Sequence, residues 1–406
     1  MLSAAYDILA EQESPEPQPM QNVTTSVPDT TTVLPPHTRK CNQLSTGAIL
    51  LADILPSLIV KMTAALWVHR VTHRIRVPIA ILFATASFII VACSVGIWMS
   101  LLGVACASFS SGLGELTFLG LTAFYHKNTV SSWSSGTGGA GLFGALSYAG
   151  LTATGLSPQH SILVMLVVPA VMTLSYYVIL DHVTSPPSPC CVKAGDTTPL
   201  IEQPPNTSPE DDEDCVAEHE EGAVQAGKVH VKLMCLQERL KLILPLLKYM
   251  VPLFGVYVAE YYINQALFEL IYFEHIWLTL AEQYRWYQVD YQMGVFISRS
   301  SVNVYHTKRI WVFPLLQVAN AVFFTVEAYF LFVPHISIIL IVVLFEGLMG
   351  GGAYVNCFYA IREEVAPEVR EFSLAVASVS DSTGTCLAGF LSIPVHNYIC
   401  SLPIPG

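Results

Sequence analysis

The stretch "SSGTGGAGLFGALSYAG", residues 134–150, is compatible with two different folds. Gly136, Gly138 and Gly141 have the G-x-G-x-x-G spacing of a loop that binds dinucleotide phosphates, but such a loop needs a preceding strand and a following helix in a βαβ unit. The alternative is a membrane helix whose small residues let another helix approach closely. The rest of the chain distinguishes these interpretations.

Composition favours the membrane helix. The chain has 406 residues, of which 53% are hydrophobic and only 12% charged, and its mean hydropathy is +0.52. Soluble globular domains carry about 25% charged residues, so this composition indicates a polytopic membrane protein. Within a membrane helix, the four-residue repeat of Gly136, Ala140 and Gly144 predicts a face for close helix packing.

The distribution of apolar residues predicts the number of membrane crossings. A helix needs about 20 residues to cross ~30 Å of hydrocarbon, and about ten stretches are this long. Because helices satisfy their own backbone hydrogen bonds in lipid, the predicted fold is all-α. The expected spans lie near residues 46–67, 77–98, 101–124, 133–151, 162–180, 246–267, 286–304, 310–330, 336–358 and 372–395.

Basic residues in the short loops predict the orientation. The stretches "HRVTHRIR" (69–76) and "YHTKR" (305–309) fall on one side if every span crosses once, and the positive-inside rule makes that side cytosolic. Residues 1–10, "MLSAAYDILA", are too short to span and too acidic for a signal peptide, so we expect them to be the end of an upstream first helix. Restoring that helix would give about eleven crossings.

These patterns divide the chain into six segments. The expected division is a remnant of the first helix (1–10), a lumenal loop (11–45), an N-terminal helical bundle (46–180), a cytosolic linker (181–240), a C-terminal helical bundle (241–396) and a tail (397–406). Asn22 lies in N-V-T within the lumenal loop, which predicts N-glycosylation. The linker is rich in proline and acids, and we expect it to be disordered because it cannot bury enough apolar surface.

The linker contains a candidate sorting signal. In "DTTPLI" (196–201), Asp196 precedes Leu200 and Ile201, which is the form of a dileucine signal read by clathrin adaptor complexes. An extended peptide of this kind offers a carboxylate and two aliphatic anchors to pockets, although the pattern is short enough to arise by chance. The net charge of -12 would repel nucleic acid, but the acids gather in residues 210–221 and identify no other partner.

Ionisable residues within the apolar stretches are the main functional candidates. A charge at the bilayer centre costs ~2.5–3.5 kcal/mol and persists only with a partner, water or a function. Lys61 and Asp53 are ~12 Å apart along a helix, so Lys61 should face the bundle interior and pair with another helix. The candidates are Asp53, Lys61, Glu115, Glu260, Glu269, Arg299, Glu346 and Asp381.

Several of these candidates allow more than one role. Glu260 and Asn264 share a helix face and would point into one cavity. For Glu115, Glu260 and Glu346, a transport or proton pathway competes with structural pairing between helices and with a position nearer the membrane surface. Arg299 could instead extend to the phosphate layer.

The sequence shows no signature of an enzyme. It contains no G-x-S-x-G, H-E-x-x-H or P-loop, and its ten cysteines have neither C-x-x-C nor metal-site spacing. We therefore predict no catalytic residue, no cofactor and no metal site.

Several stretches resemble the battenin family of lysosomal membrane proteins. They cover nearly all the expected spans, whereas the linker and first loop are similar mainly in position. The matching stretches include "LLADILPSLIVK" (50–61), "SSGLGELTFLGLTAFY" (110–125), "SSGTGGAGLFGALSYAGLT" (134–152), "PLFGVYVAEYYINQALFEL" (252–270), "FEGLMGGGAYVNCF" (345–358) and "REFSLAVASVSDSTG" (370–384).

The resemblance implies a fold, a location and a set of roles. The family looks like a divergent branch of the major facilitator superfamily, with two helical bundles joined by a cytosolic linker. Its members are associated with lysosomal and late-endosomal membranes, export of glycerophosphodiesters, lysosomal pH, basic amino acid homeostasis and endolysosomal trafficking. The family's dileucine signal falls on Asp196, Leu200 and Ile201, and its "AEYxINQ" motif, which includes Glu260, falls on residues 259–265.

Two functions from different classes remain as expectations. The first is an alternating-access transporter in the lipid bilayer, with a small polar or anionic metabolite bound between the bundles. Lys61 would attract a phosphate, and Glu115, Glu260 or Asp381 would supply polar contacts or a proton site. The second is a non-transporting scaffold or trafficking regulator that recruits partners through its linker.

Overall fold

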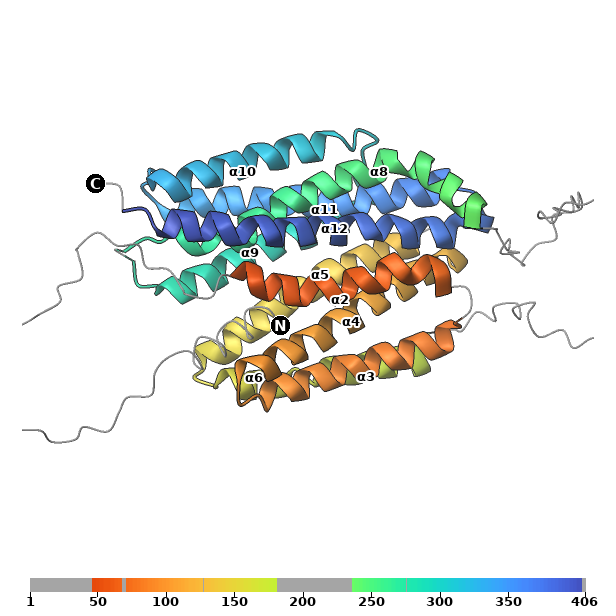
Figure 1. Ribbon diagram of the computed structural model, residues 1–406, viewed down its shortest axis with the longest axis horizontal. Helices are drawn as coiled ribbons and strands as arrows, with labels where there is room; N and C mark the ends of the chain where they lie inside the picture. The colour runs from red at the N-terminus through yellow and green to blue at the C-terminus, as the bar shows by residue number, and fades with distance from the viewer. Residues whose placement is uncertain (1–45, 68–70, 127, 181–235, 275, 404–406) are drawn as a thin grey trace, which may run out of the picture.

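A computed structural model describes residues 46–67, 71–126, 128–180, 236–274 and 276–403 (Figure 1). Every regular element in these ranges is helical, which confirms the all-α prediction for the described chain. The predictions for residues 1–45, including Asn22, and for the linker signal Asp196, Leu200 and Ile201 lie outside these ranges.

The N-terminal half, residues 46–180, is a set of helices joined by short turns. Local chemistry explains where α6 begins, because the Ser157 hydroxyl accepts a hydrogen bond from the His160 backbone N–H and Pro158 occupies the first turn, where its missing N–H is not needed. The elements are α2 (Thr46–Trp67), α3 (His73–Ala92), α4 (Ile97–Leu121), η1 (Thr122–Phe124), α5 (Thr129–Ala153), α6 (Pro158–Val164), α7 (Val167–Leu174) and the π-helix η2 (Ser175–Ile179).

The C-terminal half, residues 236–403, contains the three longest of the described helices. A capping box starts α9, since Thr279 and Glu282 each bond the other's backbone N–H. The elements are α8 (Leu236–Tyr262), the π-helix η4 (Ile263–Leu267), η5 (Phe268–Leu270), α9 (Leu280–Ser300), α10 (Val312–Phe330), α11 (Ile336–Glu364) and α12 (Pro367–Cys400).

The two halves lie side by side with their long helices roughly aligned (Figure 1). They meet mainly where α2 packs against α12 and where α5 packs against α9. The last helix of the chain therefore contacts the first described one.

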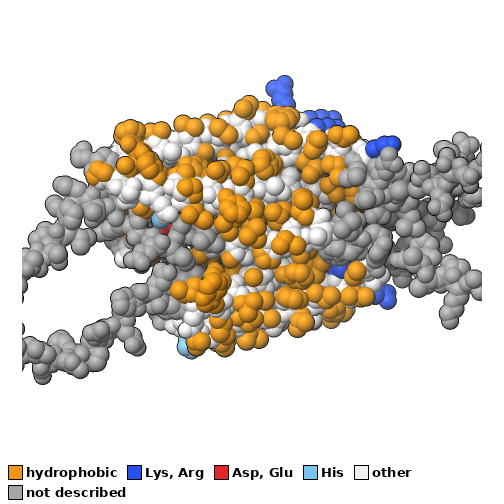
Figure 2. All heavy atoms as spheres, in the orientation of Figure 1, with side chains coloured by type: hydrophobic (Ala, Val, Ile, Leu, Met, Phe, Trp, Pro, Cys, Tyr) orange, Lys and Arg blue, Asp and Glu red, His pale blue; other side chains and the backbone are white. Residues whose placement is uncertain are grey.

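Length and apolarity identify a polytopic membrane protein. Hydrophobic side chains dominate the face shown in Figure 2, as expected of a surface that contacts lipid. Helices α2, α5 and α9 occupy three more of the ten expected spans but are not among the stretches identified by length and apolarity, so ten crossings remain a prediction. Seven helical stretches in the described ranges are long and apolar enough to cross a membrane, namely His73–Ala92, Ile97–Phe124, Pro158–Ile179, Lys241–Leu270, Val312–Phe330, Ile336–Glu364 and Pro367–Cys400.

Glycines bring α9 and α11 into close contact. A Cβ atom on Gly294 would lie 2.9 Å from the Leu348 backbone nitrogen, and one on Gly347 would lie 3.1 Å from the Val295 backbone nitrogen. Both positions therefore need a residue without a side chain, as in other small-residue contacts between membrane helices.

The packing face predicted for α5 is wrong. Gly136, Ala140 and Gly144 are exposed, and a Cβ on Gly136 or Gly144 would meet no atom within 4 Å. The buried face instead contains Gly138, where a Cβ would lie 3.0 Å from the Phe296 Cα of α9. Spacing alone identifies small-residue faces on a helix but does not say which one its neighbour covers.

Candidate functional site

A cavity of about 920 Å³ lies between the two halves. Helices α2, α4, α5 and η2 line it from the N-terminal half, and α8, α9, α11 and α12 line it from the C-terminal half. Its volume falls within the range of small-molecule sites. Lys61, Glu115, Arg299 and Asp381 all line this cavity.

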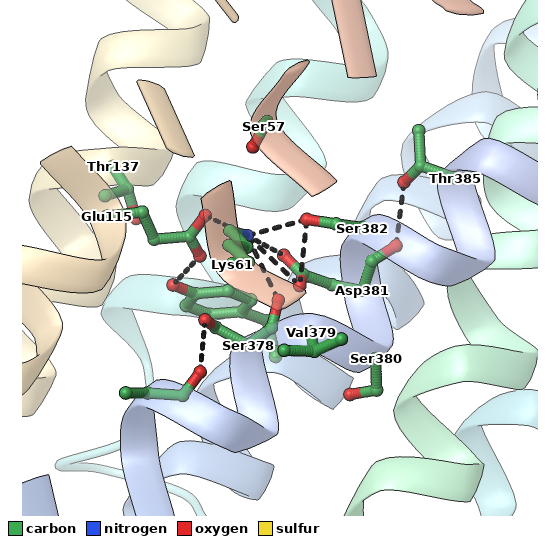
Figure 3. A network of polar contacts seen from close by, with 12 residues as sticks. Ser57, Lys61, Glu115, Thr137, Ser378, Val379, Ser380, Asp381, Ser382 and Thr385 are labelled. Carbon is green, nitrogen blue, oxygen red and sulfur yellow. Dashed lines mark hydrogen bonds and ion pairs between the residues drawn. The ribbon is translucent and has the colours of Figure 1, made fainter. Parts of the chain in front are cut away.

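Lys61 of α2 is the centre of a buried polar network (Figure 3). Its ammonium lies 2.6 Å from Glu115 Oε2 on α4 and 3.3 Å from Asp381 Oδ1 on α12. It also donates to the Ser382 hydroxyl at 2.7 Å and to the Ser378 carbonyl at 3.1 Å. Lys61 is only 3% exposed, which confirms that it faces the bundle interior and pairs with other helices.

The positive charge of Lys61 is already matched by carboxyl groups, so this network does not favour an added anion. One ammonium faces the two carboxyl groups of Glu115 and Asp381, and two further groups accept its protons. A phosphate arriving at Lys61 would have to displace a carboxylate. The expectation that Lys61 attracts a phosphate is therefore not supported by its contacts.

Tyr354 of α11 connects Glu115 to a second cation. Its hydroxyl donates to Glu115 Oε1 at 3.0 Å and accepts a longer bond of 3.4 Å from Trp133 Nε1. The second cation is Arg299, which contacts the face of the Tyr354 ring, with its guanidinium carbon 4.0 Å from the ring centre. This cation–π contact holds the guanidinium over the Tyr354 ring.

Arg299 of α9 points into the cavity. It donates to Thr137 Oγ1 of α5 at 2.9 Å and to the Tyr257 hydroxyl of α8 at 3.1 Å. The alternative in which Arg299 extends to the lipid phosphate layer is therefore wrong. Among the ion pairs of the described residues, none joins Arg299 to a carboxylate. A cation held by neutral groups beside a cavity can accept an anionic ligand.

Glu260, Asn264 and Glu346 form a separate cluster within the C-terminal half. Asn264 Nδ2 donates to Glu346 Oε1 and to the Glu260 backbone carbonyl, both at 3.0 Å, and the Tyr291 hydroxyl donates to Glu260 Oε1. None of these four residues lines the cavity. Glu260 and Asn264 were expected to point into one cavity, but they do not line this one and contact α9 and α11 instead.

Polar contacts also join the halves at the predicted cytosolic end. Arg362 of α11 donates to the carbonyl oxygens of Thr122 and Tyr125, both at 2.6 Å. Arg76 of α3 lies 3.8 Å from Glu371 of α12. Because Thr122 and Tyr125 line the cavity, Arg362 connects α11 to one edge of its wall.

The hydroxyl groups of the cavity were not predicted from the sequence. Tyr257 and Tyr354 lie in stretches that we interpreted only by their glycines and acids, and Thr137 lies in the glycine-rich stretch. Aromatic residues in apolar stretches usually fill cores. Only a tyrosine hydroxyl predicted to lie at the same level of the membrane as Glu115 could have been recognised as a cavity group.

Comparisons with known proteins agree with the resemblance. A profile of the CLN3 protein family matches residues 1–402. The chain is 44% identical to Battenin of Canis lupus familiaris over 99% of this chain and 87% of the dog protein. It is 37% identical to Protein BTN1 of Chaetomium globosum, covering 87% of this chain and 81% of the relative. Protein btn-1 of Neurospora crassa is 35% identical over 89% of this chain and 82% of its own length.

Proposed function

The chain belongs to the CLN3 protein family, and on that premise we propose that it is an alternating-access transporter of small anionic metabolites. Its substrate class is the glycerophosphodiesters, and its location is the lysosomal and late-endosomal membrane. The fold proposed for it is that of the major facilitator superfamily, with the two halves moving against each other. The resemblance of the membrane spans to the battenin family supports each part of this proposal.

One observation carries the proposal, namely the position of Arg299. Its guanidinium faces a cavity of about 920 Å³ and contacts neutral partners only in the described chain. A planar guanidinium suits the two oxygens of a phosphodiester, because it can donate parallel hydrogen bonds. The hydroxyl groups of Thr137 and Tyr257 lie beside it and suit the glycerol hydroxyls of the substrate.

The Lys61 network supports movement between the halves. Lys61 and Glu115 belong to the N-terminal half, whereas Asp381 and Ser382 belong to α12 of the C-terminal half. A conformation open to the other side would separate these partners. We assign Lys61 and Asp381 to the contact that links the halves, and Arg299 to the substrate.

The remaining roles rest on the family resemblance and on the linker. We propose that the signal at Asp196, Leu200 and Ile201 binds clathrin adaptor complexes and directs the protein to lysosomes, and that Asn22 carries a glycan. The effects on lysosomal pH, basic amino acids and trafficking follow from transport in this proposal.

The test is uptake of labelled glycerophosphocholine by proteoliposomes that contain the purified protein. Wild type should show saturable uptake, and Arg299→Gln should lower kcat/KM by about tenfold or more, which corresponds to ~1.4 kcal/mol or more. The matched control is Arg309→Gln, which removes an exposed arginine beyond the end of α9 and should transport normally. Folded wild type without saturable uptake would favour the scaffold function.

A further inference from the structure

The cluster of Glu260, Asn264, Tyr291 and Glu346 is unusual because it places two carboxyl groups together in the buried interior of the C-terminal half. All four residues are buried, and Glu260 and Glu346 are 2% and 0% exposed. The cluster joins α8, η4, α9 and α11 and lies outside the cavity assigned to the substrate.

Hydrogen-bond donors are too few for the acceptors in this cluster. Tyr291 supplies one donor to Glu260 Oε1, and Asn264 Nδ2 supplies one to Glu346 Oε1. The other three oxygens, Glu260 Oε2, Asn264 Oδ1 and Glu346 Oε2, are buried and accept no hydrogen bond from the described protein. All three are acceptors unless a carboxyl group carries a proton. Buried polar atoms of this kind are rare without a hydrogen-bond partner, so the cluster needs further hydrogen-bond donors.

Electrostatics leads to the same requirement. No cation forms an ion pair with Glu260 or Glu346 in the described part of the chain. Two neighbouring carboxylates without a cation are costly at this depth, whereas a protonated carboxyl group is neutral and gains an O–H donor. The other titratable groups that act on the pair are Tyr261, which follows Glu260 on α8, and, from adjoining helices, Tyr291, Arg299 and Asp381.

We propose that Glu260, which accepts a hydrogen bond from Tyr291, and Glu346, which accepts one from Asn264, form a proton-binding site that is separate from the substrate cavity. A proton from the acidic side binds a carboxylate oxygen and forms its O–H bond, and it leaves to water on the neutral side after the halves have moved. This deepens the proposed function, on which the coupling to substrate rests.

Two helices connect this site to the cavity. Glu260 lies one turn after Tyr257 on α8, and Tyr291 lies about two turns before Arg299 on α9. The Tyr257 hydroxyl accepts a bond from Arg299 in the cavity wall. Gly350 of α11 leaves the space that the Glu260 carboxyl group fills, since a Cβ there would lie 2.5 Å from Glu260 Cδ. A change of charge at Glu260 and Glu346 thus acts on α8 and α9, the two helices that position Arg299, which is the cation proposed to bind the substrate.

The first test follows protons and substrate together in proteoliposomes with pyranine inside. For wild type, glycerophosphocholine uptake should acidify the interior. Glu346→Gln should retain substrate counterflow but move no protons with it. Glu327→Gln is the matched control, because Glu327 is also buried in the C-terminal half but accepts a bond from the Val333 backbone N–H. Unchanged proton movement by Glu346→Gln, or a requirement for sodium at constant pH, would overturn the proposal.

A second measurement does not depend on transport. In purified wild type at neutral pH, infrared spectroscopy should detect the C=O stretch of a protonated carboxyl group, and Glu346→Gln should reduce this band. If wild type moves no substrate but this band behaves as expected, the proposed function fails and the proton site stands. Should Glu346→Gln not fold, Tyr291→Phe removes one donor and should shift the pH at which the band disappears. A band insensitive to the variant examined would contradict the site.

Discussion

Lys61 of α2 forms an ion pair with Asp381 of α12, and the two groups lie 3.3 Å apart. The contact connects the first described helix of the chain with the last one. Both residues are buried, at 3% and 6% exposed, so neither charge can be left without a partner at low cost.

Removing Lys61 alone should strongly destabilise the protein. Lys61→Met leaves two carboxyl groups facing each other, and loss of one partner of a buried ion pair costs about 3–5 kcal/mol. Thermal unfolding in detergent measures the effect. Asp381→Asn in the Lys61→Met background should recover part of the loss, because it removes one unpaired charge. A double variant as unstable as the sum of the single variants would show that the two residues do not interact.

Loosening the predicted cytosolic edge should open the cavity. Arg362→Ala removes the donors to Thr122 and Tyr125, which both line that edge. A single cysteine at Thr129, also in the cavity wall, should then react several-fold faster with an impermeant maleimide. Lys308→Ala is the control, since Lys308 is exposed and does not line the cavity. Equal labelling rates in both variants would show that Arg362 does not keep this edge of the cavity closed.

The α9 capping box should give a small pH-dependent contribution to stability. Glu282 accepts bonds from the Thr279 backbone N–H and hydroxyl, both at 2.8 Å, and these bonds lower the pKa of the Glu282 carboxyl group below its ordinary value. A lowered folded-state pKa stabilises the protein above the ordinary glutamate pKa of about 4.3, and the stabilisation is lost as pH falls through the folded value.

Comparison of wild type with Glu282→Gln checks this sign. Wild type should have the higher Tm at neutral pH, and the difference should shrink in acid. Thr279→Ala should cost about 0.5–2 kcal/mol, as expected of a lost helix cap. A Tm difference between wild type and Glu282→Gln that grows in acid would contradict the assignment.

The glycines of α9 and α5 should differ sharply in tolerance. Gly294→Ala forces α9 away from α11, because the new Cβ would lie 2.9 Å from the Leu348 backbone nitrogen, and overpacking typically costs about 1–3 kcal/mol. Gly144→Ala is the matched control, since its Cβ would meet nothing within 4 Å. Removing a helical glycine there should leave Tm equal or raise it slightly. A larger loss of stability for Gly144→Ala than for Gly294→Ala would contradict the packing described for α5.

The sequence predicts the positions of the helices better than their contacts. Apolar length is a local property, and residues 46–67 were expected to be one helix and form α2. The inward direction of Lys61 was also predictable, because a buried charge must find a partner. Its partners were not, since Glu115 and Asp381 are 54 and 320 residues away. The direction of Arg299 likewise depends on the stacking surface that Tyr354 supplies from another helix.

Counterflow is the measurement that tests the central claim most directly. Proteoliposomes are loaded with unlabelled glycerophosphocholine and diluted into a trace of labelled substrate. An alternating-access carrier should accumulate label transiently above equilibrium, and Arg299→Gln should strongly reduce this accumulation. Label that only equilibrates passively, with folded protein present, would contradict the account, because a channel or a scaffold gives that result.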